Sequence, residues 1–265
     1  MPKKSLSGKV FLLITGASRG IGRQIAISFG SMLEEGSHVV LLATNLNGLK
    51  ETAKNIPNNI SVDTVSVDLS KATKEELESI IMTSLSQKNK EPQQFEKMVI
   101  VHNIGTMGNT SQAVDVATDI TAWHNYFDLN VFIPAMLNNV LMKIFNEAKN
   151  VNKTVINITS LYALEPLKFA THYCTGKAAR EMFFKVFALD NPEVDVLNYS
   201  PGPVETDMFH ELCEKHSDDA IRKQFNEVVT NKTILTCEQT VNQLVNVLEA
   251  HKYTSGDHVD YYDQL

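Results

Sequence analysis

A tyrosine and a lysine, Tyr173 and Lys177, lie four residues apart in a stretch whose pattern predicts a helix over 171–190. Side chains at this spacing lie on the same helix face, one turn apart. An isolated phenol has a pKa of about 10, and a neighbouring ammonium favours the phenolate and lowers that pKa. The pair could therefore exchange a proton with a substrate near neutral pH. The alternative is a surface tyrosine beside a solvated lysine, and the pair alone does not separate the two.

A hydroxyl group is placed to join this pair. Ser160 follows a predicted strand at 153–159 and precedes Tyr173 by 13 residues. In an open parallel sheet, the carboxyl end of a strand and the start of the next helix border the same ligand crevice. The hydroxyl and the phenol can meet over that crevice, which predicts a site that gives a proton and hydrogen bonds to a substrate oxygen.

The elements that position these residues follow from an alternation of strand-length apolar runs and longer helical patterns, which is typical of a parallel sheet with crossover helices. Strands are predicted at 10–15, 38–43, 61–67, 98–103, 153–159 and 194–199. Helices are predicted at 20–34, 46–55, 72–88, 119–148 and 171–190, followed by polar helical stretches at 206–229 and 237–250 and a short last strand within 255–262. We therefore expect an α/β fold: a single doubly wound, Rossmann-like parallel sheet of about seven strands with helices on both faces, in one domain over 1–265.

Composition narrows the class of partner. The chain is 43% hydrophobic and carries a formal net charge of −7, with its basic residues scattered, which argues against nucleic acid. The apolar runs are strand-sized, so we expect no membrane span and no signal peptide. Three cysteines, Cys174, Cys213 and Cys237, form neither an even disulfide set nor a metal-binding spacing. We expect a cytoplasmic protein without a metal site.

A glycine-rich turn joins the first predicted strand to the first predicted helix. Its spacing is Gly-x-x-x-Gly-x-Gly, and glycines at such a turn let the backbone approach a pyrophosphate, which the helix dipole and free amides bind. The alternative is a crowded strand-to-helix junction, but the position after the first strand favours a nucleotide. The expected cofactor-binding residues of this turn are Gly16, Ala17, Ser18, Arg19, Gly20, Ile21 and Gly22.

The ends of the next strands indicate which dinucleotide is bound. Strand two ends in Thr44-Asn45, without the acidic residue that holds the ribose 2′-hydroxyl of NAD. Arg19 could face a 2′-phosphate instead, which favours NADP(H), although a solvated loop arginine explains it nearly as well. After strands three and four come Asp68-Leu69 and Asn103, also expected at the crevice. Taken singly, each polar residue among them could equally be an ordinary turn or capping residue.

In combination, these motifs resemble the short-chain dehydrogenase/reductase family over nearly the whole chain. The resemblance rests on the glycine turn, Asn130 in the helix predicted at 119–148, Ser160, the Tyr173/Lys177 pair, and Pro201-Gly202 after the sixth strand. It implies that Tyr173 protonates a substrate carbonyl as hydride arrives from the nicotinamide. It further implies that Lys177 lowers the Tyr173 pKa and binds the ribose, that Ser160 bonds the carbonyl oxygen, and that Asn130 holds a water. A homodimer built through the two long helices is also implied.

Longer stretches around Ser160, Tyr173 and 197–208, with the tail 255–263, are similar to the branch of that family that reduces the side-chain carbonyl of sepiapterin and related 6-acyl pterins in tetrahydrobiopterin biosynthesis. The branch implies a small-molecule pterin substrate, with Asp260 on its amino-pyrimidine edge; an exposed aspartate in a frayed tail is the alternative. The implied substrate-binding residues are Ser160, Leu161, Tyr173, Gly202 and Asp260. The segment implied to lie against the nicotinamide and diphosphate is Val204, Glu205, Thr206, Asp207, Met208 and Phe209.

The chain departs from that branch at three places. Thr44-Asn45 stands where Arg-Asn is usual, which predicts a weaker preference for NADP. His102-Asn103-Ile104-Gly105 replaces Asn-Asn-Ala-Gly, and Phe169-Ala170 replaces a Gly-Trp pair, so packing and substrate range could differ. Two alternatives stay open: a carbonyl reductase of other small carbonyls, and a dinucleotide-binding protein that has lost its chemistry.

Overall fold

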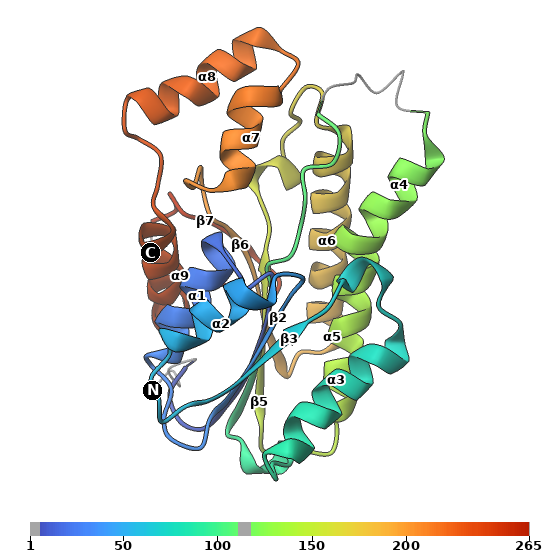
Figure 1. Cartoon of the computed structure of the whole chain (residues 1–265), viewed down its shortest axis with the longest axis vertical. Helices are drawn as coiled ribbons and strands as arrows, with labels where there is room; N and C mark the ends of the chain where they lie inside the picture. Colours follow the sequence, from blue (N-terminus) through green and yellow to red (C-terminus); the bar gives the residue numbers. More distant parts are fainter. Residues whose placement is uncertain (1–5, 111–117, 265) are drawn as a thin grey trace.

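A computed structural model describes residues 6–110 and 118–264 of the chain (Figure 1). These residues form one seven-stranded sheet in the order β3-β2-β1-β4-β5-β6-β7, and every neighbouring pair of strands is parallel. The strands are β1 Val10–Thr15, β2 His38–Ala43, β3 Ser61–Ser66, β4 Lys97–His102, β5 Asn152–Ile158, β6 Val194–Ser200 and β7 His258–Asp260. The order reverses between β1 and β4, which is where a doubly wound sheet opens its ligand crevice.

The strand sequences explain their places in the sheet. Every residue of β1, β2 and β4 is buried, as expected for central parallel strands that helices cover on both faces. The sequence of β3 is more polar and partly exposed, and β3 forms one edge of the sheet. Residues of β1 alternate between two cores: Leu12 and Ile14 face one side, and Phe11 and Leu13 face the other.

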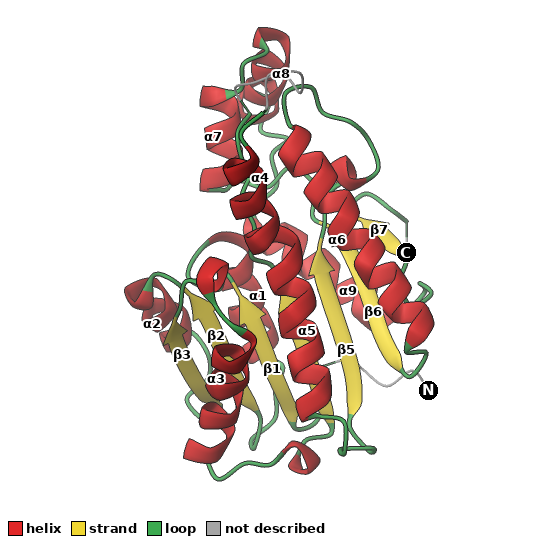
Figure 2. Ribbon diagram, turned by 90° about the vertical axis from the view of Figure 1, so that its right-hand side faces the viewer, coloured by secondary structure: helices red, strands yellow, loops and turns green. Residues whose placement is uncertain are grey.

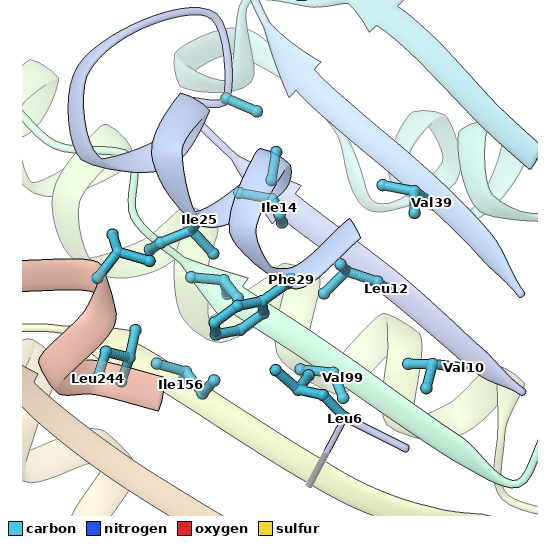
Figure 3. Close-up of a cluster of buried hydrophobic side chains, with 14 of the residues drawn as sticks. Leu6, Val10, Leu12, Ile14, Ile25, Phe29, Val39, Val99, Ile156 and Leu244 are labelled. Atoms are coloured by element: carbon cyan, nitrogen blue, oxygen red, sulfur yellow. The ribbon is translucent and has the colours of Figure 1, made fainter. Parts of the chain in front are cut away.

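The helices that cover these two faces differ (Figure 2). One face packs against α1 Gly20–Gly30, α2 Leu46–Lys54 and α9 Cys237–Ala250, with Phe29 and Leu244 central in its core (Figure 3). The other face packs against α3 Lys74–Gln87, α5 Ile133–Ile144 and α6 Thr171–Asp190. We call them the α1 face and the α6 face. The predicted single doubly wound sheet is confirmed.

Two helices lie beyond the carboxyl ends of the strands, above the sheet in Figure 1: α7 Asp207–Lys215 and α8 Asp219–Thr230. Phe209 and Leu212 of α7 and Phe225 of α8 form a third apolar cluster with Tyr173 of α6. This cluster covers the start of α6 and so shields Tyr173 from solvent.

The predicted strands agree with the structure within about a residue at each end, except that the last strand is limited to β7. Three predicted helices are wrong in extent. The helix at 20–34 ends at Gly30, and the stretch at 206–229 is divided at 216–218, where Asp218 caps a new helix, α8. The helix at 119–148 consists of α4 Ile120–Phe127, a π-helical turn at Asp128–Phe132, and α5.

In the parts of the chain that the structure describes, no helix has the length and apolar character needed to span a bilayer.

Candidate active site

The glycine turn between β1 and α1 has the conformation that a close backbone approach requires. Gly16 and Gly20 adopt φ angles of +68° and +57°, in the left-handed region that glycine tolerates. A Cβ at Gly22 would lie 2.4 Å from the Gly16 oxygen, so only glycine lets α1 start this close to the strand. Ala17 is buried in the core of the α1 face, Ser18, Gly20 and Ile21 are half-buried, and Arg19 is exposed.

The N-terminus of α1 is open to an anion. Its N-cap residue, Arg19, makes no side-chain cap hydrogen bond, whereas α2 and α7 are capped by Asn45 and Thr206. Uncapped first-turn amides and the helix dipole are the elements of a phosphate site. The turn therefore fits the diphosphate of a dinucleotide.

Asn103, expected at the crevice, braces this turn. Its Nδ2 donates to the carbonyl oxygens of Thr15 and Gly16 at 3.1 and 3.2 Å, and its backbone nitrogen donates to Thr15 Oγ1 at 3.1 Å. The same Thr15 hydroxyl donates to Val101 O. Asn103 thus fixes the loop after β4 against the loop after β1, across the point where the strand order reverses.

The cofactor-binding residues expected after the second and third strands lie at the ends of β2 and β3. Thr44 is exposed, and Asn45 caps α2 by accepting from Gly48 N at 2.9 Å. Asp68 accepts hydrogen bonds from the Ser70 hydroxyl and backbone, and these bonds keep the pKa of its carboxyl below the ordinary value. Leu69 beside it is buried. All four follow the carboxyl ends of neighbouring strands, on the side of the sheet where the glycine turn lies.

The segment 204–209 lies directly across from the glycine turn. Arg19 Nη1 is paired with Asp207 Oδ2, although both side chains are largely exposed. A Cβ on Gly20 would lie 3.6 Å from Thr206 Cγ2. Val204 and Phe209 are buried, Glu205 is exposed, and Met208 is half-buried against the cluster around Tyr173. The structure therefore brings two predicted cofactor segments together, and Arg19 faces an aspartate.

Tyr173 and Lys177 lie on the buried face of α6, 8% and 9% exposed. Lys177 Nζ is 5.6 Å from the centre of the Tyr173 ring and donates to the carbonyl oxygens of Ile158 and Thr159 at 2.8 and 3.4 Å. Ser160 follows directly and accepts from Tyr162 N at the start of the short helix Leu161–Ala163. Tyr173 also hydrogen-bonds with Ser160, so the structure places the three side chains together. The reading of the pair as a surface tyrosine and a solvated lysine is wrong, because both residues are buried.

The expected lowering of the Tyr173 pKa is wrong in its net direction. Burial raises the pKa of the phenol, and hydrogen bonding with Ser160 and the charge of Arg180 lower it by less. Burial also lowers the pKa of the Lys177 ammonium well below its ordinary value, and Arg180 adds to that shift. Desolvation disfavours the charged form of each group and outweighs their proximity. Tyr173 is therefore protonated at neutral pH, which is the form that a general acid needs.

Asn130 lies in the π-helical turn that divides the predicted helix. Its Nδ2 donates to Tyr126 O at 2.8 Å, and its Oδ1 accepts from Thr106 N at 2.9 Å. These bonds fix the buried side chain between the turn and the loop after β4. Single π turns inside α-helices are frequent at functional sites because the extra residue re-aims backbone groups.

The tail, for which a role in substrate binding was expected, lies beside Gly202. A Cβ on Gly202, whose φ is +71°, would lie 2.9 Å from Leu235 and 3.5 Å from both Tyr261 and Tyr262. Asp260 pairs in register with Ser200, and its Oδ1 accepts from Tyr262 N at 3.0 Å. Asp260 is thus an ordered, half-buried residue, and the reading of it as part of a frayed tail is wrong. Leu161, the residue after Ser160, is 44% exposed.

Two buried charges near the site were missed from the sequence. Arg180 and Glu181 are 1% and 2% exposed on α6. The buried positions Tyr173, Lys177, Arg180, Phe184 and Ala188 follow a helical period. The signal was present in the sequence, since that period places Arg180 on the same face as the catalytic pair.

The arrangement can perform one kind of chemistry. A protonated phenol and a serine hydroxyl lie together after the carboxyl end of β5, and the glycine turn after β1 fits a phosphate, so a carbonyl oxygen there could receive a proton while a dinucleotide supplies hydride. No group of His, Cys, Asp or Glu side chains within 6–110 and 118–264 could hold a metal ion. The site therefore defines an oxidoreductase of alcohol and carbonyl groups that depends on a nicotinamide dinucleotide.

Comparison with known proteins gives the family. The short chain dehydrogenase model matches residues 10–217. Sepiapterin reductase from Bos taurus is 32% identical over 97% of this chain and 96% of its own length, and that from Xenopus laevis is 32% identical over 97% of each. The structure of L-sorbose reductase from Gluconobacter frateurii, complexed with NADPH and L-sorbose, is 25% identical, with a TM-score of 0.76 over 98% of this chain and 97% of that one. The chain belongs to the short-chain dehydrogenase/reductase family, in its sepiapterin reductase branch.

Proposed function

We propose that the protein reduces the side-chain carbonyl of sepiapterin and related 6-acyl pterins with NADPH. The observation that carries this proposal is the tail: β7 sets Asp260 in register with Ser200, and Tyr261 and Tyr262 against Gly202, at the crevice end of the sheet. A carboxylate there can accept two parallel hydrogen bonds from an amino-pyrimidine edge. Sepiapterin reductases from Bos taurus and Xenopus laevis are 32% identical to this chain over 97% of its length.

The residues divide the reaction among them. Tyr173 gives its phenolic proton to the carbonyl oxygen, and Ser160 donates a hydrogen bond to the same oxygen. Lys177, held by the carbonyls of Ile158 and Thr159, offers its remaining hydrogen-bond capacity to the nicotinamide ribose. Asn130 holds a water that returns a proton to Tyr173. A bound NADPH would supply the hydride.

The choice of NADPH over NADH rests on the end of β2. Thr44 and Asn45 place no carboxylate there to repel a 2′-phosphate, and Arg19 supplies a cation across the turn. Arg19 is paired with Asp207, so it must exchange this partner to bind a phosphate. We expect a preference for NADPH that is real but modest, and comparing kcat/KM for NADPH and NADH measures it.

A substrate-dependent assay tests the function. Purified protein is mixed with NADPH and sepiapterin, and the loss of both chromophores is followed. Asp260→Ala should lower kcat/KM for sepiapterin about 10- to 100-fold, the effect of losing a hydrogen bond to a charged group. Turnover of benzil, which has no amino-pyrimidine edge, should stay unchanged in the same variant. Equal loss on both substrates would contradict the role of Asp260.

The second candidate is a reductase of small diketones. Benzil reductase from Bacillus subtilis is 29% identical to this chain over 74% of its length. Ala170, buried at the start of α6, leaves a site without the bulk of the tryptophan expected in the branch. Turnover of benzil without turnover of sepiapterin would select this candidate.

The same proposal includes a homodimer that forms through α6. Met182, Val186 and Leu189 lie at helical spacing on α6 and are 59%, 48% and 81% exposed, whereas Phe184 on the opposite side is fully buried. An apolar stripe of this kind is a typical interface. Light scattering should give twice the 29.6 kDa chain mass, and Val186→Glu should halve it. A monomeric wild type would refute the dimer.

The three cysteines are free thiols, which is compatible with the proposed cytoplasmic location.

A further inference from the structure

The side chain of Arg180 is a fully buried guanidinium in the middle of α6, two turns after Tyr173. Its Nε donates to Asn157 Oδ1, and its Nη1 donates to Ile104 O at 2.7 Å. Its Nη2 donates to His102 O and, at 3.3 Å, to Ile158 O. All the donors of the fork face oxygen atoms, as a buried arginine requires.

These acceptors lie on the segments that form the active site. His102 and Ile104 flank Asn103, which braces the glycine turn. Ile158 O also accepts from Lys177 Nζ, so the two cations of α6 share one carbonyl at the end of β5. Nη1 lies 3.5 Å from Asn130 O in the π turn. The Arg180 side chain therefore links three segments: the loop after β4, the strand β5 before Ser160, and the π turn that holds Asn130.

Among the residues that the structure describes, no carboxylate is paired with Arg180. All five acceptors are neutral carbonyl or amide oxygens. The neighbouring carboxylate of Glu181 bonds elsewhere: it accepts from Thr159 Oγ1 and His258 Nδ1 and pairs with Lys185. A buried charge without a counter-ion acts strongly on other groups in the same low-dielectric region.

We propose that Arg180 is a positioning residue of the reductase: it holds Lys177 and the Asn130 turn in place, and its charge favours the transfer of the Tyr173 proton to substrate. The inference rests on the proposed reduction through Tyr173, but not on a pterin as substrate. Proton transfer leaves a phenolate, and a fixed cation nearby stabilises that anion.

The other groups that face Tyr173 either raise its pKa or lower it through a hydrogen bond. Burial raises the Tyr173 pKa, and Cys174 and Tyr162 add to the rise, while Ser160 lowers it through hydrogen bonding. Burial raises the pKa of Tyr126, on α4; Tyr173 raises it further, and Arg180 lowers it. Glu181 raises the Lys177 pKa and opposes Arg180 there. Arg180 is thus the cation whose field lowers the pKa of both members of the catalytic pair.

The test is the pH dependence of turnover in Arg180→Met and Arg180→Lys, with sepiapterin or, if that is inert, benzil. The Met variant should lose at least tenfold in kcat, and the midpoint of its kcat against pH should move upward by about one pH unit, because the field of a nearby charge is gone. The Lys variant keeps the positive charge but lacks the guanidinium donors that bond several oxygen atoms at once. The midpoint of its kcat against pH should therefore equal that of wild type, while kcat falls.

Controls separate this role from a purely structural one. Lys185→Met removes a cation from the same helix one turn further on, and its midpoint should match wild type. NADPH binding, followed by its fluorescence, should persist in Arg180→Met. A wild-type midpoint in Arg180→Met would overturn the inference, and so would equal midpoint shifts in the Met and Lys variants. If Arg180→Met does not fold, the Lys variant still decides, because a shifted midpoint there contradicts the electrostatic role. A wild type without turnover of any carbonyl would instead refute the proposed function.

Discussion

The two faces of the sheet bury different kinds of side chain. The α1 face is an apolar core in which the polar side chains around α9 are hydroxyls, such as those of Tyr199 and Thr240. The α6 face buries Lys177, Arg180 and Glu181 beside a row of polar residues on consecutive strands. His102, Asn157, Asn198 and His258 are paired in register across β4, β5, β6 and β7. Apolar burial stabilises the α1 face, whereas charged and polar side chains take the place of some apolar ones on the α6 face.

The row on the α6 face is a connected network. Arg180 Nε bonds Asn157, Asn157 Nδ2 donates to Asn198 Oδ1 at 2.8 Å, and Asn198 Nδ2 donates to Gly256 O at 2.9 Å. A separate hydrogen bond joins Glu181 to His258, two residues before Asp260, and among the described residues His258 Nε2 has no hydrogen-bond partner. The hydrogen bonds that are present offset part of the cost of burying polar groups and favour one arrangement of them. The face that carries the chemistry is therefore organised by hydrogen bonds, which hold the catalytic helix and the tail in a fixed relation.

The largest expected effect is on the α6 face. Tyr173→Phe removes the phenolic proton and leaves the ring in its apolar cluster, so kcat should fall about 10²- to 10⁴-fold. NADPH affinity and the melting temperature should stay near wild type, since the glycine turn is untouched. Steady-state kinetics and a fluorescence titration with NADPH measure the two. Full activity in this variant would remove Tyr173 from the mechanism.

The α1 face should respond in the opposite way. Leu244→Ala on α9 opens a cavity in a fully buried position, and such truncations cost about 2–5 kcal/mol of unfolding free energy. The activity of the molecules that remain folded should be unchanged, because Leu244 contacts the side of the sheet away from α6 (Figure 3). Urea unfolding and kcat per folded molecule provide the comparison. A kcat loss as large as that of Tyr173→Phe would mean that the two faces are not independent.

The same contrast explains which parts of the fold were predictable. Strands β1, β2 and β4 are continuous apolar runs, and their limits were predicted within a residue because burial on both faces determines their composition. The helix expected at 119–148 was wrong because its π turn is held by a tertiary hydrogen bond, which Asn130 Oδ1 accepts from Thr106 N, 24 residues away in the sequence. Local sequence does not encode partners more than 20 residues away.

In the site, residue types were predictable and their electrostatics were not. The spacing of Tyr173 and Lys177, together with Ser160 and the glycine turn, marked them as candidates, but the sign of the Tyr173 pKa shift depends on how deeply α7 and α8 bury the phenol. Those helices are polar and amphipathic, and their docking over α6 leaves no local signal. Arg180 and Glu181 were missed because charged residues in a helix are usually solvent-exposed.

Glu181→Gln tests the charge of the network on the α6 face. Burial raises the pKa of this carboxyl, but hydrogen bonds from His258, Lys185 and Thr159 lower it more, to about 2. A lowered carboxyl pKa stabilises the fold above the unfolded value of about 4.3, and that stabilisation is lost as pH falls toward 2. At pH 7 the unfolding free energy of wild type should exceed that of the Gln variant by up to about 3 kcal/mol. The difference should shrink below pH 4.5, as measured by urea unfolding at several pH values. A difference independent of pH would contradict the ionised state.

The smallest effect belongs to a tyrosine that matches Tyr173 in type but lies on the other face. Tyr199 donates its hydroxyl to Thr240 O at 2.9 Å, between β6 and α9. Tyr199→Phe removes only neutral hydrogen bonding between this hydroxyl and Thr240, which should cost about 1 kcal/mol and lower the melting temperature by about 2–4 °C. Its kcat and its pH midpoint should equal those of wild type, because the Tyr199 ring packs in the core of the α1 face. Differential scanning calorimetry and a pH profile measure both. A shift of the midpoint in Tyr199→Phe would show that polar groups on the α1 face also tune the catalytic pair.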